Sequence, residues 1–195
     1  MKYSIIAIGD ELLIGQVTDT NSGWIAREMS VYGWELQKVQ VVPDNADAIK
    51  KAIDIAFEES DVVLATGGLG PTKDDITKTT LCDYFGGELI FDDATLANVL
   101  EVVEKRHLKL NEYTRNQAYV PSSCKVVQNE VGTAPILWFE KDEKVLVSMP
   151  GVPFEMQHMM KKVLIPKLVK KTHDNMHLQY RTFIVIDIIE SLLAM

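Results

Sequence analysis

The chain has 195 residues, 47% of them hydrophobic and 25% charged, and a formal net charge of −8. This is an ordinary globular composition, which excludes a long disordered chain, a collagen and a coiled coil. The excess of acidic residues argues against a protein that coats nucleic acid, and the length predicts one full domain plus a short additional segment.

The two cysteines, Cys82 and Cys124, belong to no CxxC motif. We therefore expect that the protein is located in a reducing compartment and that its thiols have no chemical role. No apolar run of 18 residues predicts a transmembrane helix, and residues 1–6 enter a strand pattern without the order of a signal peptide. These features predict a cytoplasmic protein that binds neither membranes nor nucleic acid.

The first half of the chain alternates predicted strands and helices. A short apolar, β-branched run predicts a buried strand at 4–8, and two further strands are predicted at 36–42 and at 61–66, the last almost wholly apolar. Apolar residues at helical spacing predict a helix after each strand, at 18–32, 46–59 and 76–85. This order predicts a parallel sheet with covering helices, joined by right-handed crossovers.

The second half is less regular. It predicts helices at 92–108, 112–119 and 154–171, the last one bent at Pro166. Predicted strands follow at 125–127, 136–140 and 145–149, and the last two form a hairpin that makes the sheet mixed.

The C-terminal segment predicts one more strand, at 180–188, and a helical turn at 190–195. These two elements are too few to bury a core of their own. We expect a main domain over residues 1–171 and, over residues 172–195, a linker and the start of a truncated second module.

The densest chemical signal is the glycine loop, TGGLGPTKDDIT, which runs from Thr66 to Thr77 directly after the third strand. Its glycines allow sharp turns, so that backbone N–H groups and the N-terminus of the following helix can bind an anion. The loop is neither a Walker A nor a GxGxxG motif. Because ligands of α/β sheets bind beyond the carboxyl ends of strands, we predict that phosphate groups contact Gly67, Gly68, Leu69, Gly70 and Thr72.

Carboxylates beside a phosphate site would repel the ligand unless a cation intervened. Asp74 and Asp75 therefore predict a bound Mg²⁺ or similar hard cation, and the alternative is that one of them caps the following helix. Asp10 and Glu11 follow the first strand and are candidate ligands of the same cation, or part of a polar loop. Asp44 follows the second strand, where the alternative is an Asx-turn.

Several other segments can rim a pocket, although each is by itself most often a turn or a solvated helix face. Thr18–Asn21 can reach a phosphate or a ribose, and Arg115–Pro121 offers a cation and amides. The turns at 132–135 and 148–156 can also rim the pocket. From these segments we predict that Asn21, Thr133, Pro150 and Gly151 contact the substrate. The four histidines lack HxxxH or HxH spacing, so a zinc site is not predicted.

The last predicted helix carries apolar residues at helical spacing. These residues are Met156, Met159, Met160, Val163 and Leu164. They indicate packing in the core or against another subunit, so a homo-oligomer is a fair hypothesis.

Five ordered motifs within residues 3–170 resemble the CinA (competence/damage-inducible protein) family. They are GDELLIG at 9–15 with DTN at 19–21, the glycine loop, NQAYVP at 116–121, GTAP at 132–135 and PGVPFEM at 150–156. The domain concerned is the one that CinA shares with the molybdopterin-binding proteins MogA and MoeA. The resemblance implies a three-layer α/β/α fold with a mostly parallel, mixed sheet.

The resemblance also implies an activity: hydrolysis of ADP-ribose to AMP and ribose 5-phosphate with a divalent metal, Mg²⁺, Mn²⁺ or Co²⁺. In MogA-like relatives the positions that match Asp44 and Asp75 are functional. Two positions depart from the family pattern: Ile136 replaces a usual glycine, and DIIES at 187–191 replaces Gly-Ile-Gly-Glu-Ser. The nicotinamide-mononucleotide deamidase domain of many CinA proteins is absent from this sequence, and we do not assign that activity.

Together these signals predict a metal-dependent hydrolase of a nucleotide-sugar diphosphate. The glycine loop would hold the diphosphate, Asp10, Asp74 and Asp75 the cation, and Asp44 or Glu11 would orient the attacking water. One alternative is a molybdopterin-binding or adenylyl-transferring enzyme of molybdenum-cofactor assembly, whose ligand would be a pterin phosphate. Another is a non-enzymatic nucleotide-binding or interaction module.

Overall fold

A computed structural model describes residues 1–72 and 74–172 of the chain. The predicted strand at 180–188 and the predicted helical turn at 190–195 lie outside the described residues. Within the described part, no helix is both long and apolar enough to cross a membrane.

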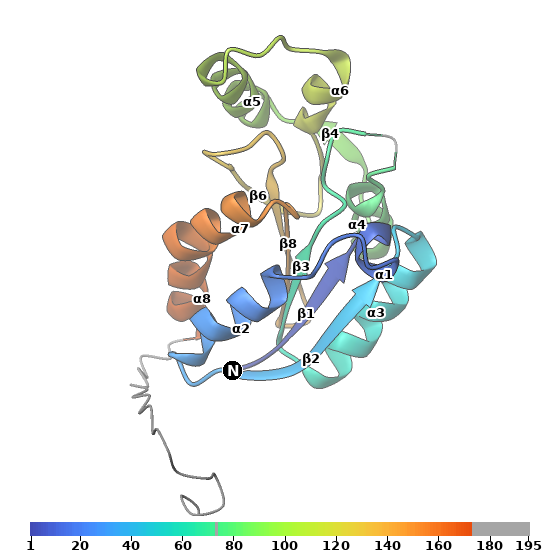
Figure 1. Ribbon diagram of the computed structural model, residues 1–195, viewed down its shortest axis with the longest axis vertical. Coiled ribbons are helices and arrows are strands. Elements are labelled where there is room, and N and C mark those ends of the chain that lie inside the picture. The colour runs from blue at the N-terminus through green and yellow to red at the C-terminus, as the bar shows by residue number, and fades with distance from the viewer. Residues whose placement is uncertain (73, 173–195) are drawn as a thin grey trace, which may run out of the picture.

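A six-stranded sheet forms the centre of the molecule (Figure 1). The strands, in spatial order, are β2 (Glu35–Val42), β1 (Lys2–Ile8), β3 (Val62–Thr66), β8 (Lys144–Met149), β7 (Ile136–Lys141) and β6 (Lys125–Val127). The pairings from β2 to β8 are parallel, whereas β7 runs antiparallel to both β8 and β6. The predicted mixed sheet and its hairpin are confirmed.

Helices cover both faces of the sheet because successive side chains of each strand point to opposite sides. Ile5 and Leu64 pack in a core with α2 (Asn21–Ser30), α7 (Pro153–Met159) and α8 (Ile165–Thr172). Ile6 and Val63 pack in a second core with α3 (Ala46–Glu59) and α4 (Thr77–Phe85). The predicted three-layer α/β/α fold is confirmed.

A small lobe, which the sequence did not predict as a unit, lies above the carboxyl edge of the sheet (Figure 1). The predicted helix at 112–119 was wrong in its second half. The segment forms α6 (Glu112–Arg115), a 3₁₀ turn, η1 (Asn116–Ala118), and a strand, β5 (Tyr119–Pro121). The strand pairs with β4 (Leu89–Phe91), which is only three residues long and therefore too short to show a period in the sequence. The helix α5 (Asp93–Lys105), predicted at 92–108, completes the lobe.

The last predicted helix is irregular before Pro166. It divides into α7, a π-helical turn, η2 (Met160–Leu164), and α8. A proline inside a helix removes one backbone donor and clashes with the carbonyl four residues earlier, and a π turn before it accommodates both effects.

The methionines of this helix lie in the core rather than on a free surface. Met156, Met159, Met160 and Leu164 are each 0% exposed. Their stripe therefore lends no support to a subunit interface, and the homo-oligomer stays a prediction without that argument.

Candidate functional site

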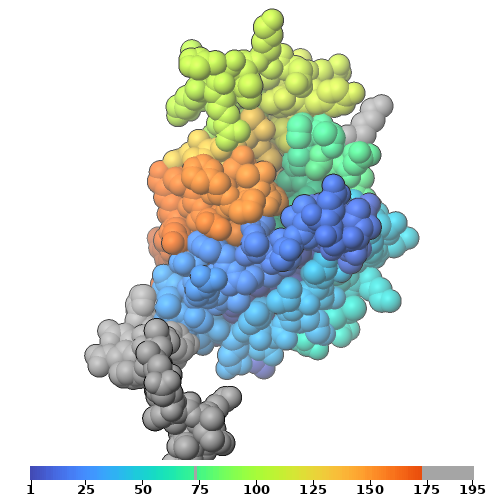
Figure 2. All heavy atoms as spheres, in the orientation of Figure 1, coloured from blue at the N-terminus to red at the C-terminus, as the bar shows by residue number. Residues whose placement is uncertain are grey.

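A cavity of about 540 Å³ opens at the carboxyl edge of the sheet. In Figure 2 the dark blue residues of α1 (Asp10–Leu13), a single turn that the sequence did not predict, border this edge below the yellow-green lobe. Almost all of the predicted site residues line the cavity: Glu11, Asn21, Asp44, Gly67, Gly68, Leu69, Gly70, Asp74, Asp75, Thr133, Pro150 and Gly151. Of the predicted set, Asp10 and Thr72 are not part of its lining.

The glycine loop passes through a gap too narrow for larger residues. Gly67 has a φ of +106°, and a Cβ atom there would lie 2.1 Å from the carbonyl oxygen of Ile8. A Cβ on Gly151 would lie 3.3 Å from the Cα of Gly67, while the Gly67 N–H donates to the Met149 carbonyl at 3.0 Å. The loop is thus held between the ends of β1 and β8, and glycine is required at Gly67.

Asp75 organises the loop from within. One carboxylate oxygen, Oδ1, accepts a hydrogen bond from the Gly70 N–H at 2.8 Å. The other, Oδ2, accepts from the Thr72 N–H at 2.9 Å and from Thr72 Oγ1 at 2.5 Å. The cap of α4 falls on Ile76 and has no side-chain hydrogen bond, so the predicted alternative of an aspartate cap is wrong.

Asp44 lines the same cavity as Glu11, Asp74 and Asp75. Its Oδ2 accepts a hydrogen bond from the backbone N–H of Asp10 at 3.2 Å. Burial raises the pKa of Asp44, and the negative charges of Asp10, Glu11 and Asp75 raise it further. Asp44 is therefore a half-buried carboxylate with acidic neighbours and one backbone donor, which is an environment that favours accepting a proton.

The three carboxylates predicted as metal ligands, Asp10, Asp74 and Asp75, are not gathered into one group in the described residues. Among the described residues, no group of three or more His, Cys, Asp or Glu side chains can hold a metal ion. Asp10 does not line the cavity, and the oxygens of Asp75 accept hydrogen bonds from the loop. What the acidic cavity does fit is a Mg²⁺-type cation held by one or two carboxylates and by the phosphates of a ligand.

Asn21 presents an acceptor to the same cavity. It is 7% exposed, and its Nδ2 donates to the Gly151 carbonyl at 2.8 Å. Its Oδ1 is buried and has no hydrogen-bond partner among the described residues. A buried acceptor in a cavity wall is satisfied when a ligand supplies an O–H or N–H donor, such as a sugar hydroxyl.

The sequence did not single out two further lining residues, Gln117 and Glu155. Gln117 is 1% exposed, and its Nε2 donates to the Leu69 carbonyl of the glycine loop at 2.8 Å. Glu155 is 8% exposed and accepts from the Asn129 Nδ2 at 2.9 Å. Their segments were candidates, but only the fold shows that these two polar side chains are buried against the site.

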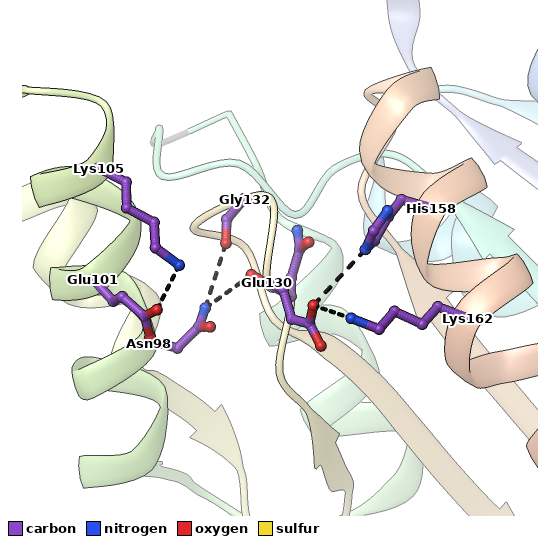
Figure 3. Close-up of polar contacts among 8 residues, drawn as sticks. Asn98, Glu101, Lys105, Glu130, Gly132, His158 and Lys162 are labelled. Atoms are coloured by element: carbon purple, nitrogen blue, oxygen red, sulfur yellow. Dashed lines mark hydrogen bonds and ion pairs between the residues drawn. The ribbon is translucent and has the colours of Figure 1, made fainter.

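The loop that carries Glu130 and Gly132 is held from both sides (Figure 3), and the next residue, Thr133, lines the cavity. The Asn98 side chain of α5 donates to the carbonyls of Asn129, at 3.0 Å, and Gly132, at 3.4 Å. On the opposite side, Glu130 pairs with Lys162 of η2 at 2.5 Å. The loop is therefore tied to both the lobe and the helical layer, which keeps Thr133 at the rim.

Comparison with known proteins gives the following relatives. Residues 4–170 match the model of a family described as a probable molybdopterin binding domain. A CinA-like protein of Flavobacterium psychrophilum is 41% identical over 195 residues, which are 100% of this chain and 46% of that protein. Another, of Cytophaga hutchinsonii, is 43% identical over 190 residues, 97% of this chain and 45% of that protein. The chain thus spans less than half the length of these relatives.

Solved structures agree with this assignment. The CinA protein of Thermoplasma acidophilum superposes with a TM-score of 0.75 at 34% identity, covering 85% of this chain and 96% of that one. The tungsten cofactor synthesizing protein MoaB of Pyrococcus furiosus gives a TM-score of 0.55 at 21% identity, covering 89% and 96%. The second likeness is evidence of a shared fold alone.

Proposed function

On the premise that the chain belongs to the family of probable molybdopterin-binding domains, in its CinA-like group, we propose that it hydrolyses the diphosphate bond of a nucleotide sugar. The substrate we propose is ADP-ribose, and the products are AMP and ribose 5-phosphate. The observation that carries the proposal is the position of Asp44, a half-buried carboxylate with a raised pKa, in the same cavity as the glycine loop.

The residues of the cavity have separate tasks in this reaction. Backbone N–H groups of the glycine loop bind the diphosphate, and Asp75 keeps that loop in shape as a positioning residue. A water oxygen forms a bond to one phosphorus while the bridging oxygen leaves with the other phosphate. Asp44 accepts the proton of the attacking water, for which its raised pKa suits it.

Two further residues complete the assignment. The unpartnered Oδ1 of Asn21 accepts a hydrogen bond from a hydroxyl group of the pentose. Glu11, which lines the same cavity, would hold a divalent cation, Mg²⁺, Mn²⁺ or Co²⁺, together with the diphosphate. Such a cation neutralises phosphate charge and lowers the pKa of bound water.

A second candidate function uses the same anion-binding loop. The matched family is described by molybdopterin binding, which favours a pterin phosphate as the alternative ligand, with adenylyl transfer as the alternative reaction. Binding of a nucleotide without turnover would make the chain an interaction module.

The test is to incubate the protein with ADP-ribose and Mg²⁺, Mn²⁺ or Co²⁺ and to measure AMP by chromatography. We expect metal-dependent AMP formation that Asp44→Asn reduces at least ~100-fold, since a positioned general base contributes about 10²–10⁴-fold. Asp47→Asn, at an exposed aspartate in the first turn of α3, is the matched control. If folded protein forms no AMP with any of the three metals, the proposal is wrong, and molybdopterin binding is the next assay.

A further inference from the structure

A second cavity, of about 570 Å³, adjoins the first. Gly70, Pro71, Asp75 and Gln117 line both cavities, so the glycine loop and the buried Gln117 form a common wall. The function proposed above uses only the first cavity, although a nucleotide sugar consists of two halves joined by a diphosphate.

Lys78 supplies a positive charge to the second cavity. Its Nζ donates to the Asn116 carbonyl at 3.2 Å and to the Gln117 Oε1 at 3.4 Å, both of which are neutral acceptors. No carboxylate lies within ion-pair distance of this ammonium group in residues 1–72 and 74–172. Burial lowers the pKa of Lys78 to about 8 and outweighs the negative charge of Asp75, which lines the same cavity and raises that pKa. A bound phosphate would give Lys78 the direct ion pair that none of the described carboxylates forms with it.

The outer wall of the second cavity is aromatic and exposed. Tyr113 and Tyr119 are 53% and 41% exposed, and Leu89 beside them is 37% exposed. The ring of Tyr119 is held edge to face against Phe91, with 5.3 Å between the ring centroids. Exposed, oriented rings beside a cavity are suited to stacking on a planar base.

We propose that the second cavity binds the nucleoside monophosphate half of the substrate, with the base against Tyr113 and Tyr119 and its phosphate facing Lys78. The pentose phosphate half would then occupy the first cavity, so that the diphosphate crosses the wall formed by the glycine loop. This inference rests on the proposed function for the identity of the ligand, but its residues are different from those that carry the chemistry.

The test measures binding rather than turnover. Calorimetric titration of the full chain with AMP gives a dissociation constant for the wild type, for Tyr113→Ala and for Lys78→Met. We expect Tyr113→Ala to weaken AMP binding roughly 5- to 50-fold, since one aromatic–base stack has an effect of that size, and Lys78→Met to weaken it about 10-fold. The affinity for ribose 5-phosphate should be unchanged in both variants.

Matched controls come from outside both cavities. Phe154→Ala removes a ring that is 65% exposed, and Lys170→Met removes an exposed charge near the end of α8. Neither should alter AMP binding. Because Tyr113 is exposed, its variant should fold even if Lys78→Met does not, and circular dichroism verifies this.

The outcomes separate the two proposals. Wild-type protein that does not bind AMP, or AMP binding that both variants leave unchanged, overturns the second-cavity assignment. If AMP binding depends on Tyr113 but no metal supports ADP-ribose hydrolysis, the second cavity stands as a nucleotide site and the proposed hydrolysis fails.

Discussion

Gly67 and Gly23 illustrate how differently one residue type can act in the same chain. Gly67 combines a φ of +106° with a carbonyl oxygen 2.1 Å from where its Cβ would lie. Gly23 lies exposed in α2, and a Cβ there would meet nothing within 4 Å. The first glycine is required by geometry, whereas the second only adds flexibility to the unfolded chain.

Substitution by alanine should therefore have opposite effects at these two positions. We expect Gly67→Ala to lower the free energy of unfolding by about 2–4 kcal/mol and Gly23→Ala to raise it by roughly 0.5–1 kcal/mol. Urea unfolding followed by circular dichroism measures both changes. Equal effects of the two substitutions would contradict this reading of the loop.

The charged form of Asp44 should lower the free energy of unfolding at neutral pH. Because its pKa is raised in the folded protein, folding favours the protonated form, and the charged form costs stability once the pH exceeds that raised pKa. We expect Asp44→Asn to raise the melting temperature at pH 7 by roughly 1–3 °C. The gain should disappear as the pH falls below the raised pKa, as scanning calorimetry can show. An Asp44→Asn variant that is less stable than the wild type at pH 7 would contradict this.

Among the elements, Glu140 joins two strands and a helix. Its carboxylate pairs with Lys125 of β6 at 3.0 Å and Lys171 of α8 at 3.2 Å, and accepts from the Trp138 Nε1 at 2.8 Å. The hydrogen bonds from Lys125 and Trp138 are the largest causes that lower the pKa of Glu140 to about 2. This network fixes the edge of the sheet against α8.

The pH dependence of Glu140 has the opposite sign to that of Asp44. A lowered pKa means that its stabilisation is present above the unfolded value, about 4.3, and is lost as the pH falls towards 2. Glu140→Gln should lower the free energy of unfolding at pH 7 by about 1 kcal/mol, a modest amount because the network is partly exposed. Urea titrations at pH 7 and pH 2.5 measure the change, with the exposed Glu58→Gln as control. A loss of equal size at both pH values would argue against the ion pairs.

The reactivity of the two thiols, Cys82 and Cys124, measures whether the whole molecule is folded. Both cysteines are free, and burial raises the pKa of Cys82 and brings that of Cys124 to about 12. Since the thiolate is the reactive form, native protein at pH 8 should react with iodoacetamide at least ~100-fold more slowly than free glutathione. Labelling should accelerate only with global unfolding in urea, and rapid labelling of Cys124 in native protein would contradict this prediction.

Local sequence patterns were enough to predict the layered α/β fold and the edge of the sheet where the site lies. Strand and helix periods, and glycines or aspartates after three strands, are local signals that survive without tertiary contacts. The Gly67-Gly68-Leu69-Gly70 turn and Asp44 could be placed in one cavity because parallel strands bring their carboxyl ends together.

Which polar groups stabilise the fold and which face the cavity could be seen only from the arrangement of the elements in space. Asp75 holds the loop through the nearby Gly70 and Thr72, whereas Gln117 and Glu155 are buried against the cavity by partners 48 and 26 residues away in the sequence. The predicted ligands Asp10, Asp74 and Asp75 are not gathered at one point of the described structure, since proximity in sequence does not fix where side-chain oxygens point. The pairing of β4 with β5 was not predicted because these strands have three residues each and show no periodic pattern, whereas α5 was predicted as the helix at 92–108.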